Sequence, residues 1–171
     1  MNATISAQLL RLLVLSVPFG LVVLFILASA LPLGSLGAYA LSPNFGFAAM
    51  VYWGLRRPDL FPPLSVFLAG LAHDLIGGGP LGLWAAAYLA GYAFVLWQRV
   101  LFIGRAAFPV LVGVGFATAI GLAVAWAGAS WRSQIWLDVG PVAVHAILTV
   151  ACFPLVAMAC SAVEERLPAP E

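Results

Sequence analysis

The chain runs from Leu12 to Leu55 without a single charged side chain: LLVLSVPFGLVVLFILASALPLGSLGAYALSPNFGFAAMVYWGL. The hydrocarbon core of a bilayer is about 30 Å thick, so a helix that crosses it needs about 20 apolar residues at about 1.5 Å each. This stretch is too long for one such helix and suits two. It predicts a polytopic membrane protein, and the rest of the chain repeats the pattern.

The composition supports the same class of protein. Of the 171 residues, 64% are hydrophobic and only 8% are charged, whereas a soluble domain usually has about 25% charged residues. We therefore expect an all-α fold in a single membrane domain, residues 1–171, with no soluble domain. About six transmembrane helices are predicted, at Leu12–Leu31, Tyr39–Leu55, Pro62–Ile76, Leu81–Gln98, Ala106–Ala127 and Val139–Val163.

The basic residues predict the orientation, because cytoplasmic loops of membrane proteins carry an excess of Lys and Arg. All seven are arginines. A cytoplasmic N-terminus leaves only Arg132 outside and places the C-terminus inside as well. The other six then lie inside: Arg11, Arg56, Arg57, Arg99, Arg105 and Arg166.

The tryptophans give an independent signal, because Trp concentrates at the two membrane–water interfaces. In the predicted topology, Trp53 and Trp97 fall near the inner interface. Near the outer one fall Trp84, Trp126, Trp131 and Trp136.

The first segment has a competing interpretation. Ala28-Ser29-Ala30 resembles a signal-peptidase site that follows an apolar run. The run is about 20 residues, longer than a usual signal core. We expect a retained helix, although cleavage would leave the other segments in the same orientation.

Local signals refine the predicted helices. Ser42-Pro43 is typical of an N-cap followed by proline at the first helical position, which would leave residues 32–41 as an interfacial loop. Cys152 and Cys160 are about 12 Å apart along one helix, beyond the reach of a disulfide.

The fifth predicted helix carries a row of small residues at every fourth position. Such rows let helices approach closely. Two interpretations stay open: internal packing, or docking of a partner helix. The row consists of Gly113, Ala117, Gly121 and Ala125.

Ionisable groups inside a membrane are candidates for function, and here they are His73, Asp74 and His145. No nucleophile motif, phosphate-binding loop, dinucleotide fingerprint or metal-ligand spacing accompanies them. The sequence thus predicts a protein that is not an enzyme, with no cofactor, no metal and no nucleic-acid partner. His145 is either a neutral histidine hydrogen-bonded to a neighbouring helix or part of a ligand site.

The most distinctive stretch is residues 69–84, AGLAHDLIGGGPLGLW, which ends the third predicted helix and begins the fourth. Gly78, Pro80 and Gly82 predict a tight turn. Asp74 lies just before it, where a carboxylate meets the negative end of the helix dipole.

Asp74 therefore needs a partner, and we expect it to hold the turn in place. The candidates are the N–H groups of Gly77 to Gly79, those at the start of the next helix, and Arg132. On this hypothesis Asp74→Asn should be mild, because an amide oxygen can still accept a hydrogen bond.

Residues 70–92 resemble the signature of the bacterial rod shape-determining protein MreD family. Tyr52-Trp53, Arg56-Arg57-Pro58 and Pro62-Pro63 also resemble the family's second helix and inner loop. The detailed match covers roughly residues 50–95. Its positions are Gly70, Leu71, Asp74, Gly78, Pro80, Leu81, Gly82, Leu83, Tyr88 and Gly91.

The resemblance implies a non-enzymatic scaffold of the bacterial inner membrane, in the elongasome that organises peptidoglycan synthesis and cell shape. The implied partner is MreC, with RodA, the elongation transpeptidase and MreB contacted directly or indirectly, and membrane lipid around it. The family also resembles the substrate-binding subunits of vitamin transporters in fold.

That likeness of fold leaves an alternative function, a substrate-binding membrane subunit of a transporter for a small solute. Such a subunit needs a pocket where polar groups converge. A third possibility, an intramembrane enzyme, lacks residues to carry it. The candidates for a solute pocket are Asn44, His73, Asp74, Arg132 and His145.

Overall fold

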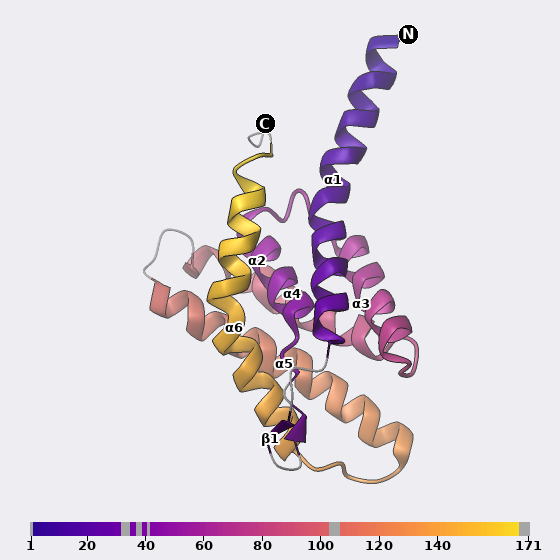
Figure 1. Ribbon diagram of the computed structural model, residues 1–171, viewed down its shortest axis with the longest axis vertical. Coiled ribbons are helices and arrows are strands. Elements are labelled where there is room, and N and C mark those ends of the chain that lie inside the picture. The colour runs from indigo at the N-terminus through magenta and orange to yellow at the C-terminus, as the bar shows by residue number, and fades with distance from the viewer. Residues whose placement is uncertain (1, 32–34, 37–38, 41, 103–106, 168–171) are drawn as a thin grey trace.

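The computed structural model describes residues 2–31, 35, 36, 39, 40, 42–102 and 107–167. Figure 1 shows an all-α architecture with one pair of short strands, each of two residues. Strand β1 (Ser35–Leu36) pairs antiparallel with β2 (Tyr39–Ala40). The helices are α1 (Asn2–Ser29), α2 (Phe45–Arg56), α3 (Pro63–Gly77), α4 (Leu83–Phe102), α5 (Ala107–Ser133) and α6 (Gly140–Glu164).

Each predicted segment corresponds to one observed helix, with different ends. Helix α1 begins at Asn2, well before Leu12. Helix α5 continues beyond Ala127 and ends at Ser133. The predicted cap of α2 at Ser42-Pro43 is wrong. Asn44 is the N-cap, because its side-chain oxygen accepts the N–H of Phe47 at 2.9 Å, the contact that defines such a cap. Much of the loop predicted at 32–41 lies outside the described residues.

Helix length and composition support fewer membrane spans than the sequence predicted. Among the described residues, two helices are long and apolar enough to cross a bilayer: Pro109–Ser133 within α5, and α6. Only 39% and 22% of their most apolar windows are buried inside the molecule, so neither is an enclosed core helix. Ser16–Ser29 and α3 are shorter apolar helices. Six spans are therefore not supported by length and composition alone.

Helix α2 forms the centre of the fold. Every residue from Gly46 to Gly54 is buried, and the helix packs against α1, α4, α5 and α6. Because α2 is enclosed on all sides, its Trp53 has no exposed surface. Trp53 therefore packs in the protein core, and its predicted depth near the inner interface stays a prediction. Trp97, Trp131 and Trp136, by contrast, are exposed.

The row of small residues on α5 faces the protein interior. Gly113, Ala117, Gly121 and Ala125 are all buried. A methyl group at Gly121 would lie 2.6 Å from the Phe47 ring and 3.0 Å from the carbonyl oxygen of Ala87 on α4. These distances favour internal packing over docking of a partner helix at this row.

The start of α1 and the end of α6 lie at the same end of the molecule (Figure 1). There Arg56, in the last turn of α2, pairs with Glu164 at the end of α6 (3.4 Å). The hydroxyl of Tyr52 donates to the same Glu164 carboxylate. The turn between α3 and α4 and the connection between α5 and α6 lie at the opposite end.

Candidate functional site

The turn between α3 and α4 is built on backbone hydrogen bonds. Helix α3 ends at Gly77, and Gly78 follows with φ +64°, a left-handed conformation that glycine adopts without a Cβ penalty. The N–H groups of Gly78 and Gly79 both donate to the main-chain oxygen of Asp74. Gly82 has φ +94°, so it too occupies a position suited to glycine.

The Asp74 side chain closes this turn from the other direction. It is 1% exposed. The N–H of Gly82 donates to Oδ2 (2.7 Å), and the N–H of Trp84 donates to Oδ1 (2.9 Å). These donors lie at the start of α4, where a carboxylate meets the positive end of the helix dipole. The main-chain oxygen of Asp74 therefore accepts the bonds that close the end of α3, and its carboxylate caps the start of α4.

The N–H groups of Gly77 to Gly79 and the Arg132 side chain, all predicted as partners of the Asp74 carboxylate, do not bind it among the described contacts. Gly78 and Gly79 bind its main-chain oxygen rather than its carboxylate. Arg132 is exposed in the last turn of α5, and no ion pair joins it to Asp74 within the described part of the chain. The helix N-terminus alone supplies the carboxylate's donors among the described contacts.

Both carboxylate oxygens of Asp74 are in use, which changes the expectation for Asp74→Asn. An amide offers one oxygen, so one of the two backbone N–H groups would face an NH₂ group instead of an acceptor. The sequence predicted a mild effect of Asp74→Asn on stability, whereas these two hydrogen bonds indicate a larger one. The remaining turn residue, Pro80, accepts the N–H of Leu83 at 3.3 Å.

Beside the turn lies a chain of polar side chains from three helices. The hydroxyl of Tyr88 donates to Oδ1 of Asn44 (3.1 Å), so its oxygen is left to accept from Nδ1 of His73 (3.1 Å). This order assigns the proton of neutral His73 to Nδ1. The His73 ring stacks on Trp84, with centroids 4.3 Å apart. Trp84 thus connects the polar chain to the Asp74 turn.

Asn44 also joins the start of α2 to α6. Its backbone N–H donates to Oγ1 of Thr149 (2.9 Å), which donates in turn to the main-chain oxygen of His145 (2.7 Å). Nδ1 of His145 lies 3.4 Å from Oγ of Ser42. The structure therefore brings Asn44, His73 and His145 together, with Asp74 adjacent.

Two buried nitrogen atoms of this cluster lack a partner among the described residues. They are Nδ2 of Asn44 and Nε2 of His145. Buried polar groups are normally hydrogen-bonded, so each such atom requires an explanation. A third, Nε1 of Trp53, belongs to the core of α2.

A small cavity, which we call the polar cavity, adjoins these two nitrogen-bearing side chains. Its volume is about 160 Å³. It lies between the ends of α1 and α3, the start of α2 and the first turns of α6. The described residues that line it are Ile26, Ser29, Ala30, Ser42, Pro43, Asn44, His73, Ile76, Gly77 and His145.

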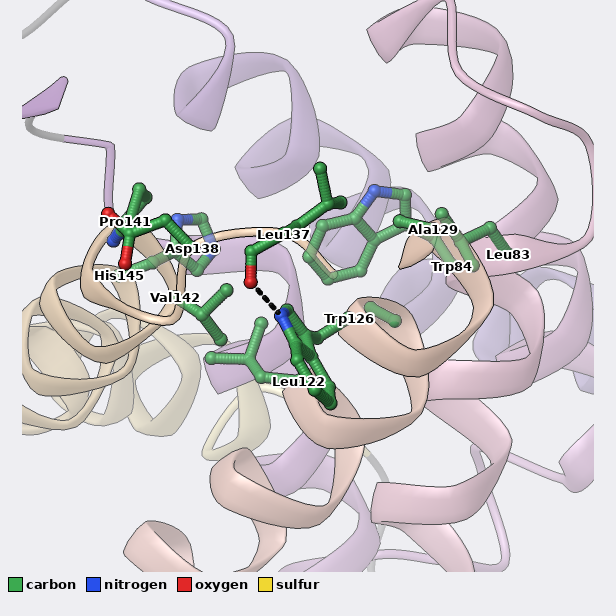
Figure 2. Close-up of a pocket in the computed structure, with 11 residues that line it drawn as sticks. Leu83, Trp84, Leu122, Trp126, Ala129, Leu137, Asp138, Pro141, Val142 and His145 are labelled. Carbon is green, nitrogen blue, oxygen red and sulfur yellow. Dashed lines mark hydrogen bonds between the residues drawn. The ribbon is translucent and has the colours of Figure 1, made fainter. Parts of the chain in front are cut away.

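A larger cavity of about 500 Å³, the apolar cavity, lies between α4, α5 and α6. Figure 2 shows its side chains, with Nε1 of Trp126 donating to the main-chain oxygen of Leu137 (3.0 Å). His145 and Asp138 are the titratable side chains of its described lining. The other residues drawn are Leu83, Trp84, Leu122, Ala125, Ala129, Pro141 and Val142.

No three His, Cys, Asp or Glu side chains among the described residues come together in a group that could hold a metal ion. Cys152 and Cys160 are free thiols. The Asp74 carboxylate holds the start of α4 in place, and polar side chains from Asn44, His73 and His145 line the polar cavity.

Sequence reasoning missed the role of Tyr88 as the link between Asn44 and His73. Tyr88 was noted only as a motif position. The N-cap signal at Asn44, a short polar side chain just before an apolar run, was present in the sequence. The pairing of Tyr88 with Asn44, 44 positions away, leaves no local pattern.

Comparisons with known proteins give no match: no protein-family model, curated protein or solved structure matches this chain.

Proposed function

We propose that the chain is a non-enzymatic membrane scaffold of the rod shape-determining MreD type, which binds MreC and helps to organise peptidoglycan synthesis. The observation that carries the proposal is the Asp74 turn. Its buried carboxylate is fully used in joining α3 to α4. A fixed turn between helices suits a binding surface, and it leaves no free carboxylate there for chemistry.

The motif positions of the resemblance have coherent packing roles. A methyl group at Gly70 would lie 2.4 Å from Cα of Ala85, and one at Gly91 would lie 2.5 Å from the Phe47 ring. Gly78 and Gly82 adopt positive φ angles. The residues that carry the likeness to the MreD family are thus also residues that this fold requires.

We further propose six membrane spans with both termini in the cytoplasm. Arg56 supports this orientation, since it pairs with Glu164 at the end of α6, which lies at the same end of the molecule as the start of α1. Helices α2 and α3, of 12 and 15 residues, are about 18 and 22 Å long. Enclosed helix α2 need not match the bilayer thickness, because protein rather than lipid surrounds it.

Cysteine labelling tests this topology in a variant that lacks Cys152 and Cys160. Single cysteines replace Arg57, Arg99 and Arg132 in turn. An impermeant thiol reagent added to intact cells should label position 132 only. Labelling of positions 57 and 99 from outside would contradict the proposed orientation.

Co-purification tests the scaffold function. Tagged protein from native membranes should retain MreC, and RodA, the elongation transpeptidase and MreB should follow directly or through it. Depletion in a rod-shaped host should give rounded cells. Purification without MreC, together with an unchanged rod shape on depletion, would defeat the proposal.

The alternative, a solute-binding transporter subunit, is favoured by one observation: Asn44, His73 and His145 line one cavity. That cavity, about 160 Å³, is smaller than the roughly 300–1,000 Å³ of most small-molecule pockets. The larger cavity is mainly apolar in its described lining. Nanomolar binding of a vitamin by purified protein, with cell shape unchanged on depletion, would select the transporter function.

A further inference from the structure

The apolar cavity has no task in the proposed scaffold, and it lies beside the helices best suited to a bilayer. Helices α5 and α6 contribute most of its described lining. They also contain the two segments of the described chain that are long and apolar enough to cross a membrane, and most of each segment's apolar window is not buried inside the molecule. In a bilayer, lipid hydrocarbon therefore surrounds the outward faces of the helices that form this cavity.

The cavity is buried at one side and open at the other. Leu122 and Ala125 on α5 are its most buried described lining residues, at 6% and 8% exposed. Asp138 and Pro141, just before and within the first turn of α6, are exposed. A ligand can therefore enter beside the connection between α5 and α6 and reach apolar walls.

The chemistry of the lining favours hydrocarbon as the ligand. Nε1 of Trp126 already donates to the main-chain oxygen of Leu137 (Figure 2), so this indole has no donor left for a polar ligand. No Arg lies in the described lining, whose one carboxylate is that of Asp138.

Asp138 also separates two sources of a hydrocarbon chain. A free fatty acid would bring its own carboxylate to the opening where Asp138 lies, and like charges repel. In a phospholipid the chain is joined through an uncharged ester, and the charged groups lie further out. The opening therefore favours the chain of a phospholipid over a fatty acid.

The volume suits one acyl chain. A cavity of about 500 Å³ corresponds to roughly 16 heavy atoms at about 30 Å³ each, the volume per molecule in liquid water. The acyl chains of common phospholipids have about this many carbons, and each methylene removed from water adds to the affinity.

The surface next to the opening is apolar as well. The rings of Trp126 and Trp136 lie 5.5 Å apart between centroids, and Trp136 is 83% exposed. Its neighbour Ile135 is 63% exposed. Trp side chains concentrate where lipid headgroups meet hydrocarbon. The cavity thus opens beside a surface that suits the outer part of the same lipid.

We propose that the apolar cavity is a binding site for one acyl chain of a membrane phospholipid, with Trp84 and Trp126 among its walls. The site rests on the membrane location proposed above, but not on the scaffold function. The backbone N–H of Trp84 donates to the Asp74 carboxylate (2.9 Å), so the bound chain lies against a residue that the Asp74 turn holds in place.

Photo-crosslinking of the full-length protein in phosphatidylcholine nanodiscs tests the proposal. The probe is a phosphatidylcholine with a diazirine on one acyl chain, and peptide mass spectrometry maps the crosslinked positions. Crosslinks should be enriched at the cavity lining over Leu64 and Leu68, exposed apolar residues of α3 that meet only bulk lipid. An equal yield at both places would mean ordinary bilayer contact and would overturn the proposal.

Two variants fill the cavity, one from each of the long helices. Ala129→Phe does so from α5, and Val142→Phe does so from α6. Ala127→Phe is the matched control, because Ala127 lies on the same helix as Ala129 but is exposed and is not part of the described lining. Circular dichroism and size-exclusion profiles establish folding.

Each cavity variant should lower the crosslink yield at the cavity about tenfold, as expected when the contacts of about two methylene groups are lost. Yields on α3, and all yields in Ala127→Phe, should stay at the wild-type level. Unchanged yields at the cavity in a folded cavity variant would overturn the proposal. If neither cavity variant folds, the distribution of crosslinks in the wild type decides.

Other occupants give different results. Excess palmitate should leave the cavity crosslinks unchanged, whereas their loss would assign the cavity to a free fatty acid and overturn the proposal. A native mass of two chains that Ala129→Phe reduces to one would assign it to a second copy, with the same consequence.

Co-purification with MreC is scored on separate membranes. Its failure with cavity crosslinks intact counts against the scaffold function alone. Its success with unselective crosslinks counts against this site alone.

Discussion

Asp74 and Asn44 are buried polar side chains that cap the helices following them, and they differ in how completely they are hydrogen-bonded. Asp74 offers two oxygens, and each accepts a backbone N–H at the start of α4. Asn44 offers an oxygen that accepts twice and a nitrogen that has no partner in the described structure. Both are 1% exposed.

The difference separates a structural role from a site with unmet capacity. A group whose hydrogen bonds are all made within the protein fixes the fold and offers nothing to a ligand. A buried group with an unmade hydrogen bond costs stability.

The largest effect is expected for Asp74→Ala. Two buried N–H groups, of Gly82 and Trp84, lose their acceptor, and the N-terminus of α4 loses its negative charge. We expect about 3 kcal/mol of destabilisation. The measurements are membrane abundance and the thermal unfolding midpoint, and both should fall.

Asp138→Ala is the matched control for this variant. Asp138 also accepts a backbone N–H near a helix start, that of Gly140 at 3.0 Å, but it is exposed. Water replaces the lost acceptor, so abundance should stay near the wild-type level. An equal loss in both variants would show that burial of Asp74 is not the cause.

A smaller effect is expected for Asp74→Asn, about 2 kcal/mol, because one N–H keeps its acceptor and the other faces an NH₂ group. The thermal midpoint should fall between those of the wild type and Asp74→Ala. A wild-type midpoint together with lost MreC co-purification would instead mean that the partner reads the charge of Asp74.

The sequence predicted those features that depend on neighbours along the chain. The need of Asp74 for donors followed from helix direction alone, and the donors lie only 8 and 10 positions away. The all-α class followed from apolar runs between arginines. The number of helices is likewise a local property.

Features that depend on which helices contact one another could not be predicted from the sequence. Trp53 and Trp97 have similar apolar surroundings in the sequence, yet only Trp53 is enclosed, because α2 is the central helix. Asn44 reaches Tyr88 and Thr149 across 44 and 105 positions. Arg132 was grouped with the candidate pocket residues by its polarity, but it is exposed at the end of α5.

Tyr88→Phe tests the polar chain between the two regions. The change removes the hydroxyl that donates to Asn44 and accepts from His73, and it keeps the ring in the core. We expect about 1.5 kcal/mol of destabilisation, since Nδ1 of His73 is left without its acceptor. The thermal midpoint measures it. Tyr92 also has a buried hydroxyl, which donates to the main-chain oxygen of Phe61 at 2.5 Å, and Tyr92→Phe provides the comparison away from the cavity.

The smallest effect, about 1 kcal/mol of destabilisation, is expected for Gly78→Ala. This variant tests whether the turn between α3 and α4 depends on the left-handed backbone conformation at position 78 as well as on Asp74. Gly78 has φ +64°, which an L-residue adopts at a cost, although a Cβ there meets nothing within 4 Å. Gly77→Ala is the matched control, because Gly77 is helical, equally open, and gains helix propensity from alanine. The thermal midpoint should fall for position 78 and hold or rise for position 77. Since neither variant touches the Asp74 carboxylate, a fall at position 78 measures the conformational term alone. Equal midpoints would assign the rigidity of the turn to the two hydrogen bonds of Asp74.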